Sequence, residues 1–180
     1  MKTITSKSGK NFIFKRLTVN DSEALGRYFE GLYNETRQRF APHPLNPAYA
    51  TFLCHKILEN ALRFVLVDEQ KEIHGYFILD FDLIHHEADR YLNYGIELKA
   101  GKDVFFAPSI ADKYQNHGLS SLVMPYIIEI AKVDSVASIV LLGGTRETNH
   151  LAMAFYEKFG FKKVGGYHTD VYNFDMQLVF

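Results

Sequence analysis

The segment from residue 103 to residue 120, DVFFAPSIADKYQNHGLS, decides the fold and the candidate chemistry of this chain. Its apolar pattern predicts a strand over Asp103–Ala111, a loop over Asp112–Gly118 and a helix that begins at Leu119. Gly118 lets the backbone approach a ligand closely, and the first turn of a helix presents free N–H groups at its positive end. This arrangement suits a phosphate or pyrophosphate, although a plain turn from strand to helix explains a single glycine equally well.

Two common phosphate-binding motifs are absent from the sequence. No Gly-Lys-Ser/Thr sequence accompanies Gly118, so the loop is not a nucleotide P-loop. The three-glycine spacing of a dinucleotide site is also missing. Gly143-Gly144-Thr145 again lacks a lysine, and its glycines are interpreted as turn residues.

Periodicity and turn residues on either side of the opening segment predict an α+β fold. The predicted elements, in chain order, are strands in a hairpin over Thr3–Ser6 and Asn11–Val19, a helix from Asn20 to Tyr33, a rigid proline loop over Phe40–Pro47, a helix from Pro47 that reaches Ile57, strands over Arg63–Asp68 and Ile73–Leu83, a polar connection over His85–Asp89, strands over Tyr91–Lys99 and Asp103–Ala111, a helix from Leu119, a strand over Ala137–Leu142, a helix from Thr148 to Phe159, and a hairpin over Lys162–Tyr167 and Val171–Val179. We interpret this order as an α/β sandwich with helices on both faces of a mixed, mostly antiparallel sheet. Residues 1–180 are expected to form a single domain.

The composition favours a globular domain with neither nucleic acid nor a membrane as partner. Apolar residues make up 47% of the 180, and 20 Lys and Arg against 21 Asp and Glu give a net charge of -1. Nucleic-acid binding usually requires a basic surface, and a membrane helix needs about 20 consecutive apolar residues. The first seven residues lack a signal-peptide region, and the single cysteine, Cys54, excludes an internal disulfide and a multi-cysteine metal site. We therefore expect a cytoplasmic protein.

A second motif, downstream of the loop, covers residues 149–161, NHLAMAFYEKFGF. The pattern Asn-x-x-Ala-x-x-Phe-Tyr-x-x-x-Gly-Phe, preceded by a Gln-x-x-Gly-x-small loop, resembles the GNAT superfamily of acyl-CoA-dependent N-acetyltransferases. The positions that carry the resemblance are Gln115, Gly118, Asn149, Ala152, Phe155, Tyr156, Gly160 and Phe161. The order of the predicted elements agrees with that family over essentially the whole chain.

The resemblance implies acetyl-CoA as co-substrate, no metal, and a pair of splayed parallel strands, here Asp103–Ala111 and Ala137–Leu142. Main-chain groups of Ser109, Ile110 and Ala111 would then pair with the pantetheine arm. The pyrophosphate would lie on the loop formed by Gln115, Asn116, His117, Gly118, Leu119 and Ser120, and the thiol end would be flanked by Asn149, Ala152, Phe155 and Tyr156.

The implied reaction is direct transfer of an acyl group from the thioester to a primary amine. Tyr156 would donate a proton to the departing thiolate, and a main-chain N–H near Ile110 would polarise the carbonyl. The alternative for Tyr156 is a ring that only packs, and the alternative for Asn149 is a first-turn helix residue. A catalytically silent acyl-CoA sensor or scaffold of the same fold is the second hypothesis for the whole chain.

Three positions depart from the family pattern. Ser120 stands where Gly or Ala is usual, Asp112 replaces the usual proline and brings a negative charge near the anion site, and Pro125 lies inside the predicted helix. None of the three removes a backbone donor from the loop itself.

The general base and the acceptor amine are not identifiable from the sequence. Candidate bases are Asp103, Glu97, Glu147 and His150, each of which more often plays a solvated role. The pair His85-His86 points to opposite sides of an extended chain, which argues against a metal site. Acceptor-pocket walls are expected from the first two helices, the proline loop and the connection from Leu83 to Ala100. The acceptor is a small molecule or a peptide, and homodimerisation through the closing hairpin is a further expectation.

Overall fold

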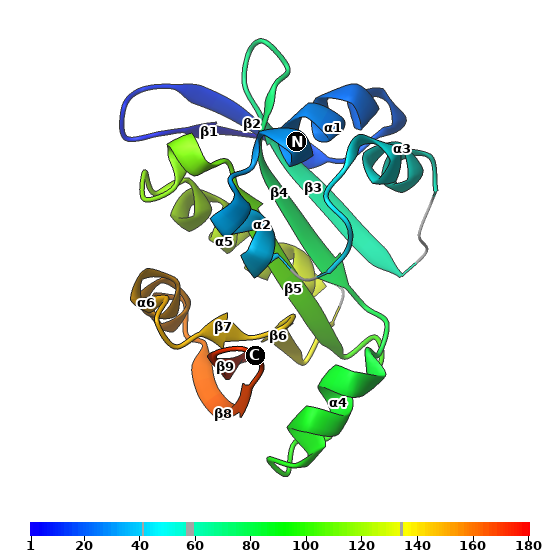
Figure 1. Cartoon of the computed structure of the whole chain (residues 1–180), viewed down its shortest axis with the longest axis vertical. Helices are drawn as coiled ribbons and strands as arrows, with labels where there is room; N and C mark the ends of the chain where they lie inside the picture. Colours follow the sequence, from blue (N-terminus) through cyan, green and yellow to red (C-terminus); the bar gives the residue numbers. More distant parts are fainter. Residues whose placement is uncertain (41, 57–59, 134) are drawn as a thin grey trace. The chain divides into compact units, whose positions relative to one another are not determined.

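The computed structural model describes residues 1–40, 42–56, 60–133 and 135–180 (Figure 1). The strands are β1 Lys2–Thr5, β2 Asn11–Arg16, β3 Ala61–Val67, β4 Ile73–Asp80, β5 Asp103–Ile110, β6 Ser138–Leu141, β7 Thr145–Arg146, β8 Lys162–His168 and β9 Tyr172–Val179. The α-helices are α1 Ser22–Gly31, α2 Asn34–Arg39, α3 Pro47–His55, α4 His85–Leu92, α5 Leu119–Val133 and α6 His150–Lys158, and 3-10 turns cover Val19–Asp21 and Asp112–Tyr114.

The nine strands of the described residues form one mixed sheet. Neighbouring strands pair in the order β1-β2-β3-β4-β5-β6-β9-β7, and β8 also pairs with β9. The pair β5–β6 is parallel, whereas the pairs β1–β2, β2–β3, β6–β9, β7–β9 and β8–β9 are antiparallel. The predicted α+β class with a mixed sheet is therefore confirmed.

The chain divides into two compact units, which are described separately. Unit 1 contains Met1–Ile78 and Ala107–Val123, and unit 2 contains Leu79–Phe106 and Met124–Phe180. Strands β4 and β5 and helix α5 each contribute residues to both units.

Unit 1 begins with the predicted hairpin. Lys2 pairs with Phe14 and Thr5 pairs with Asn11, and the Gly9 N–H donates to the Ser6 carbonyl across the turn at 3.0 Å. Gly9 has a φ of 78°, a conformation that glycine adopts without strain. Strand β2 then pairs with β3, which extends the sheet from the hairpin.

Helices α1 and α3 of unit 1 pack closely against each other. A Cβ at Gly26 of α1 would lie 3.3 Å from the Cα of Pro47, the first residue of α3, so glycine at this position permits the contact. The Asn46 side chain caps α3 by accepting from the Tyr49 N–H at 2.8 Å, which confirms the predicted helix start. Ile57, predicted to continue this helix, lies outside the described residues.

The short helix α2 was not predicted. Its sequence, NETRQR, has no apolar periodicity and therefore carries no hydrophobic signal for a helix. Glu35 accepts a hydrogen bond from Arg39 along the helix, and the Arg37 guanidinium donates to the carbonyls of Phe29 and Leu45. The two Arg37 contacts join α2 to the backbone on either side of it, so polar contacts hold this helix in place.

In unit 2, β5 and β6 pair in parallel from Asp103↔Ser138 to Phe106↔Leu141. The Leu142 N–H donates to the Phe106 carbonyl at 3.0 Å, and β5 continues to Ile110. The closing hairpin β8–β9 is confirmed, whereas the two-residue strand β7 was not predicted. The core of this region contains Tyr91, Leu98, Phe105 and Val140.

The predicted connection over His85–Asp89 and the predicted strand over Tyr91–Lys99 are wrong. Residues 85–92 form helix α4, and turns follow it. Glu87 and Tyr91 lie one helical turn apart, and both are buried on one face of α4. The burial of Glu87 depends in part on a distant segment, since the Gly143 N–H that donates to it lies 56 residues away in the sequence.

Candidate functional site

The loop between β5 and α5, residues 111–118, forms a compact turn with two left-handed residues. The Tyr114 N–H donates to the Ala111 carbonyl at 2.8 Å, and the Gln115 N–H donates to the Asp112 carbonyl at 3.1 Å. Asn116 has a φ of 63° and Gly118 a φ of 80°. Turns that contain left-handed residues can direct backbone N–H groups toward one side, as they do in anion-binding loops.

The start of α5 supplies further donors next to this loop. Gly118 precedes the helix and accepts from the Leu122 N–H, so the N–H groups of Leu119, Ser120 and Ser121 belong to the first turn, which has no intrahelical acceptors. The positive end of the helix dipole lies at the same place. These residues fit a phosphate group, and Ser120 keeps its backbone donor despite its departure from the family pattern.

Gln115 and His117 have a different role in the loop from the one the motif suggested. Both backbone N–H groups donate within the loop, that of His117 to Tyr114 at 3.4 Å. The Gln115 side-chain amide donates to Thr36 Oγ1 at 2.9 Å and to the Ile110 carbonyl at 3.2 Å. Gln115 therefore joins the loop by hydrogen bonds to α2 and to the end of β5.

The Asp112 carboxylate is bound by α2. Oδ2 accepts from the Tyr33 N–H at 2.9 Å, and Oδ1 accepts from Thr36 Oγ1 at 2.5 Å. The negative charge that the sequence placed near the anion site is therefore engaged with the first turn of α2, where the helix dipole favours an anion.

The end of β5 is held by three contacts within unit 1. Ser109 is buried, and its Oγ shares a hydrogen bond of 2.8 Å with the Tyr28 hydroxyl. Burial raises the pKa of Tyr28, so its phenol stays protonated at neutral pH. The Ala111 N–H donates to the His74 carbonyl at 3.0 Å, and Ile110 is the carbonyl that Gln115 contacts.

The second motif lies on α6, in unit 2. Asn149 caps the helix by accepting from the Ala152 N–H at 3.2 Å, which is the first-turn role considered as its alternative. The Phe155 ring packs edge-on against Tyr156, with ring centroids 5.1 Å apart.

Tyr156 is the residue of the second motif, residues 149–161, whose surroundings shift its pKa. The residue is 8% exposed, and its ring packs against Phe161 with centroids 5.4 Å apart. Desolvation raises the pKa of Tyr156, so the phenol remains protonated through the neutral range. A protonated phenol can donate a hydrogen bond to a developing thiolate.

The four candidate bases have different surroundings. The Asp103 carboxylate accepts from Ser138 Oγ at 2.5 Å and from the Lys99 N–H at 2.8 Å, which assigns it a role in fixing the start of β5. Glu97, Glu147 and His150 are exposed. No group of three metal-ligating side chains lies close together in the part of the chain that the structure describes.

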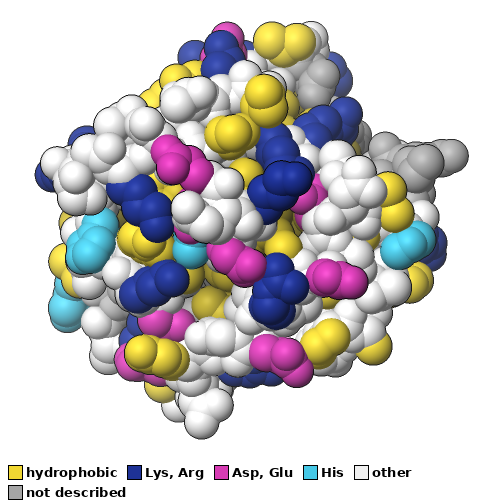
Figure 2. Space-filling view, turned by 90° about the horizontal axis from the view of Figure 1, so that it is seen from above, with side chains coloured by type: hydrophobic (Ala, Val, Ile, Leu, Met, Phe, Trp, Pro, Cys, Tyr) yellow, Lys and Arg dark blue, Asp and Glu magenta, His cyan; other side chains and the backbone are white. Residues whose placement is uncertain are grey.

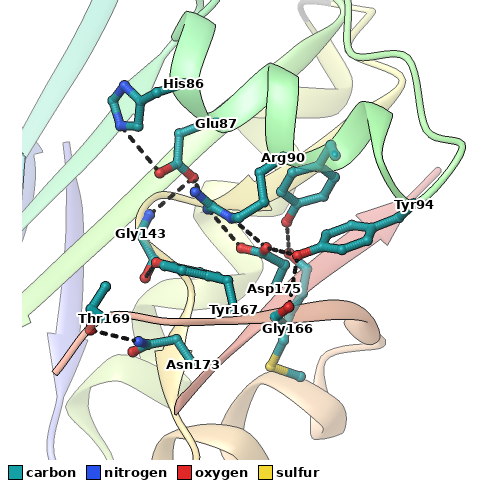
Figure 3. A network of polar contacts seen from close by, with 12 residues as sticks. His86, Glu87, Arg90, Tyr94, Gly143, Gly166, Tyr167, Thr169, Asn173 and Asp175 are labelled. Atoms are coloured by element: carbon teal, nitrogen blue, oxygen red, sulfur yellow. Dashed lines mark hydrogen bonds and ion pairs between the residues drawn. The ribbon is translucent and has the colours of Figure 1, made fainter. Parts of the chain in front are cut away.

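Arg90 lies between two buried carboxylates of unit 2 (Figure 3). Its Nε and Nη2 donate to the two oxygens of Asp175 at 2.6 and 2.8 Å, and Nη2 also donates to Glu87 at 2.6 Å. The side chains of Asp175 and Glu87 are 0% and 3% exposed. The guanidinium stacks on the Tyr167 ring at 3.8 Å from the centroid, and the Tyr94 hydroxyl donates to Asp175 at 3.0 Å.

This ionic cluster, defined as Glu87, Arg90 and Asp175, also holds the turn after β6. The Gly143 N–H donates to Glu87 at 3.3 Å, and the Tyr167 hydroxyl donates to the Gly143 carbonyl at 2.6 Å (Figure 3). Both polar groups of one turn residue are thereby satisfied by side chains from α4 and β8. Sequence analysis missed the cluster because the run around Glu87 was interpreted as a solvated connection.

His43 lies in the proline loop of unit 1, and the sequence did not single it out as a site residue. Its Nδ1 is 2.9 Å from the Pro44 carbonyl, which requires a proton on Nδ1, so Nε2 accepts from the Tyr76 hydroxyl at 3.2 Å. The ring stacks on Tyr49 with centroids 4.9 Å apart. Burial lowers the pKa of His43 to about 4, so the imidazole is neutral at pH 7.

Charges of both signs are interspersed on the face seen in Figure 2, where Lys and Arg side chains alternate with Asp, Glu and apolar groups. Among the described residues of that face, acidic, apolar and uncharged groups separate the basic side chains. Among the described residues, no helix combines the length and the hydropathy required to span a membrane.

Comparisons with known proteins identify the family of this chain. A model of the acetyltransferase (GNAT) family matches residues 29–161, which include the loop, the start of α5 and all of α6. No curated protein matches the sequence.

Solved structures share the fold over nearly the whole chain. The GNAT domain of S. lividans PAT is 13% identical, with 99% of this chain and 96% of that chain covered and a TM-score of 0.76. The ribosomal-protein-S5-alanine acetyltransferase from Vibrio fischeri is 14% identical, with 99% and 97% covered and a TM-score of 0.74. A spermidine N-acetyltransferase chimera from Vibrio cholerae and hSSAT is 19% identical, with 93% and 95% covered and a TM-score of 0.64. These identities are low, so the structural likeness establishes the fold and the family model establishes the kinship: the chain belongs to the acetyltransferase (GNAT) family.

Proposed function

We propose that this protein transfers an acyl group, most simply acetyl, from acyl-CoA to a primary amine by direct attack in a ternary complex. The observation that carries the proposal is the family match across both motifs, together with a loop whose left-handed residues lead into the N-terminus of α5. Acetyl-CoA, the co-substrate typical of the family, supplies the activated acyl group when bound.

The loop and α5 would bind the pyrophosphate of the co-substrate. We take the N–H groups of Asn116, Gly118, Leu119, Ser120 and Ser121 as the donors, because Gln115 and His117 use theirs within the loop. Gln115 would act indirectly, since its side chain fixes the loop to Thr36 and Ile110.

Tyr156 would act as the general acid toward the departing thiolate. Its raised pKa keeps the proton on the phenol until negative charge develops on the sulfur. The Ala111 N–H already donates to the His74 carbonyl, so a different main-chain N–H near Ile110 would polarise the acyl carbonyl.

The proposed acceptor is a primary amine of a small molecule or a peptide. Similar folds include enzymes named for a ribosomal-protein alanine and for spermidine, which are chemically very different amines. The attacking amine must be neutral, and the exposed Glu97, Glu147 and His150 leave deprotonation by water as the simplest route.

The test is thiol release from acetyl-CoA across a panel of amines, amino acids and peptides. Cys54 gives little background in a thiol assay, because burial raises the pKa of this thiol, the only one in the chain, to about 11. We expect release with at least one amine class. Binding of CoA without release for any amine would favour the silent sensor or scaffold instead.

Tyr156→Phe separates catalysis from binding. If Tyr156 is the acid, kcat falls on the order of 100-fold, whereas the Kd for CoA is unchanged. Tyr172→Phe removes a hydroxyl from β9 and serves as the control. Unchanged turnover in Tyr156→Phe would remove the proposed role.

A further inference from the structure

The turn of the β1–β2 hairpin places Lys7 beside the loop before α5. A Cβ built on Gly118 would meet a single heavy atom within 4 Å, the Cε of Lys7 at 3.6 Å. The ammonium lies one bond beyond that atom. Lys7 therefore reaches the residue from which the free N–H groups of α5 begin, although it lies far from Gly118 along the chain.

The hairpin is tied to the loop by a second lysine. Lys10 Nζ donates to the Tyr114 hydroxyl at 2.8 Å and to Asp68 Oδ2 at 3.3 Å. The Tyr114 ring packs edge-on against Phe12 of β2, with centroids 5.5 Å apart. These contacts join the hairpin to the loop before α5, and they bring Lys7 close to Gly118.

Lys7 differs from Lys10 and Lys15 in that its ammonium charge is free to bind an anion. Lys10 pairs with Asp68, and Lys15 pairs with Asp21 at 2.5 Å. Among the residues that the structure describes, no carboxylate forms an ion pair with Lys7, whose side chain is exposed. The Asp112 carboxylate accepts from the Tyr33 N–H and from Thr36 Oγ1, and it forms no ion pair with Lys7 among the described residues.

We propose that Lys7 is a phosphate-binding residue whose ammonium pairs with the pyrophosphate of acyl-CoA on the N-terminus of α5. The inference rests on the proposed function, and it adds a group from the first hairpin to a site otherwise made of backbone donors. Lys7 Cε lies next to Gly118, where the proposed function places the pyrophosphate, so we take the pyrophosphate and not the 3′-phosphate as the partner.

The experiment is calorimetric titration of the full chain with CoA and with 3′-dephospho-CoA. Lys7→Gln removes the charge, Lys7→Arg keeps it, and Lys162→Gln removes the charge of an exposed lysine on β8 as the matched control. We expect Lys7→Gln to weaken both ligands about fivefold at low salt, with a smaller difference at high salt because exposed charges are screened. Lys7→Arg and Lys162→Gln retain the wild-type Kd.

Each outcome decides a different point. Equal affinity of Lys7→Gln and the wild type for both ligands overturns the inference and leaves the proposed function intact. A loss for CoA but not for 3′-dephospho-CoA also overturns it, because the ammonium would then serve the 3′-phosphate. A wild-type protein that binds neither ligand contradicts the proposed function and the inference together.

Discussion

Removal of the Arg90 charge tests the ionic cluster of unit 2. Arg90→Met keeps an unbranched apolar stem but leaves Asp175 and Glu87, which are 0% and 3% exposed, without their cation. Breaking a buried ion pair by removal of one partner costs about 3–5 kcal/mol. We therefore expect the free energy of unfolding to fall by about 4 kcal/mol, which corresponds to a Tm lower by roughly 8–16 °C for a chain of this size.

The assay is thermal and urea unfolding followed by circular dichroism, with two comparison variants. Arg146→Met disrupts an exposed pair with Asp170 at 3.8 Å and should cost less than about 1 kcal/mol. Arg90→Met/Asp175→Asn also removes the buried negative charge of Asp175, which has lost its partner. The double variant should therefore be more stable than Arg90→Met. The reasoning is refuted if Arg90→Met costs no more than Arg146→Met, or if the second substitution recovers nothing.

Two further substitutions test backbone and titration arguments. Gly144 has a φ of 63°, and a Cβ there would lie 2.6 Å from the Phe174 carbonyl oxygen, so Gly144→Ala should destabilise by about 2–4 kcal/mol in urea unfolding. Gly101→Ala, with a φ of 69° but open space, should cost only about 1 kcal/mol, and equal losses would contradict the clash. The pKa of His43 is lowered to about 4, below its ordinary value of about 6.5, so the folded state resists protonation and stability falls as the pH drops from about 6.5 to 4, by up to about 3 kcal/mol. His43→Gln should remove this loss from Tm measured against pH, and an unchanged profile would show that His43 titrates normally.

The parts of the fold that sequence predicted are those specified by local signals. Local signals identified the starts of three helices. They are Pro47 at the first position of α3, Asn149 before α6 and the apolar spacing of α5, and each of them acts within one or two helical turns. Helix α4 was missed because its polar face is satisfied by Asp175, which lies 85 residues from Arg90. No local pattern distinguishes such a helix from a solvated connection.

The candidate site divides in the same way. Gly118 and the start of α5 were predicted because a glycine before a helix is a local signal. The side-chain role of Gln115 was not, since Thr36 lies 79 residues away in the sequence. Lys7 was missed for the same reason: only the folded hairpin brings it to Gly118.

A crystal structure of the protein with CoA tests the central claim most directly. The account predicts the pyrophosphate within hydrogen-bonding distance of the N–H groups of Gly118, Leu119, Ser120 and Ser121 at the start of α5. A pyrophosphate bound elsewhere, with these donors facing only solvent, would contradict it.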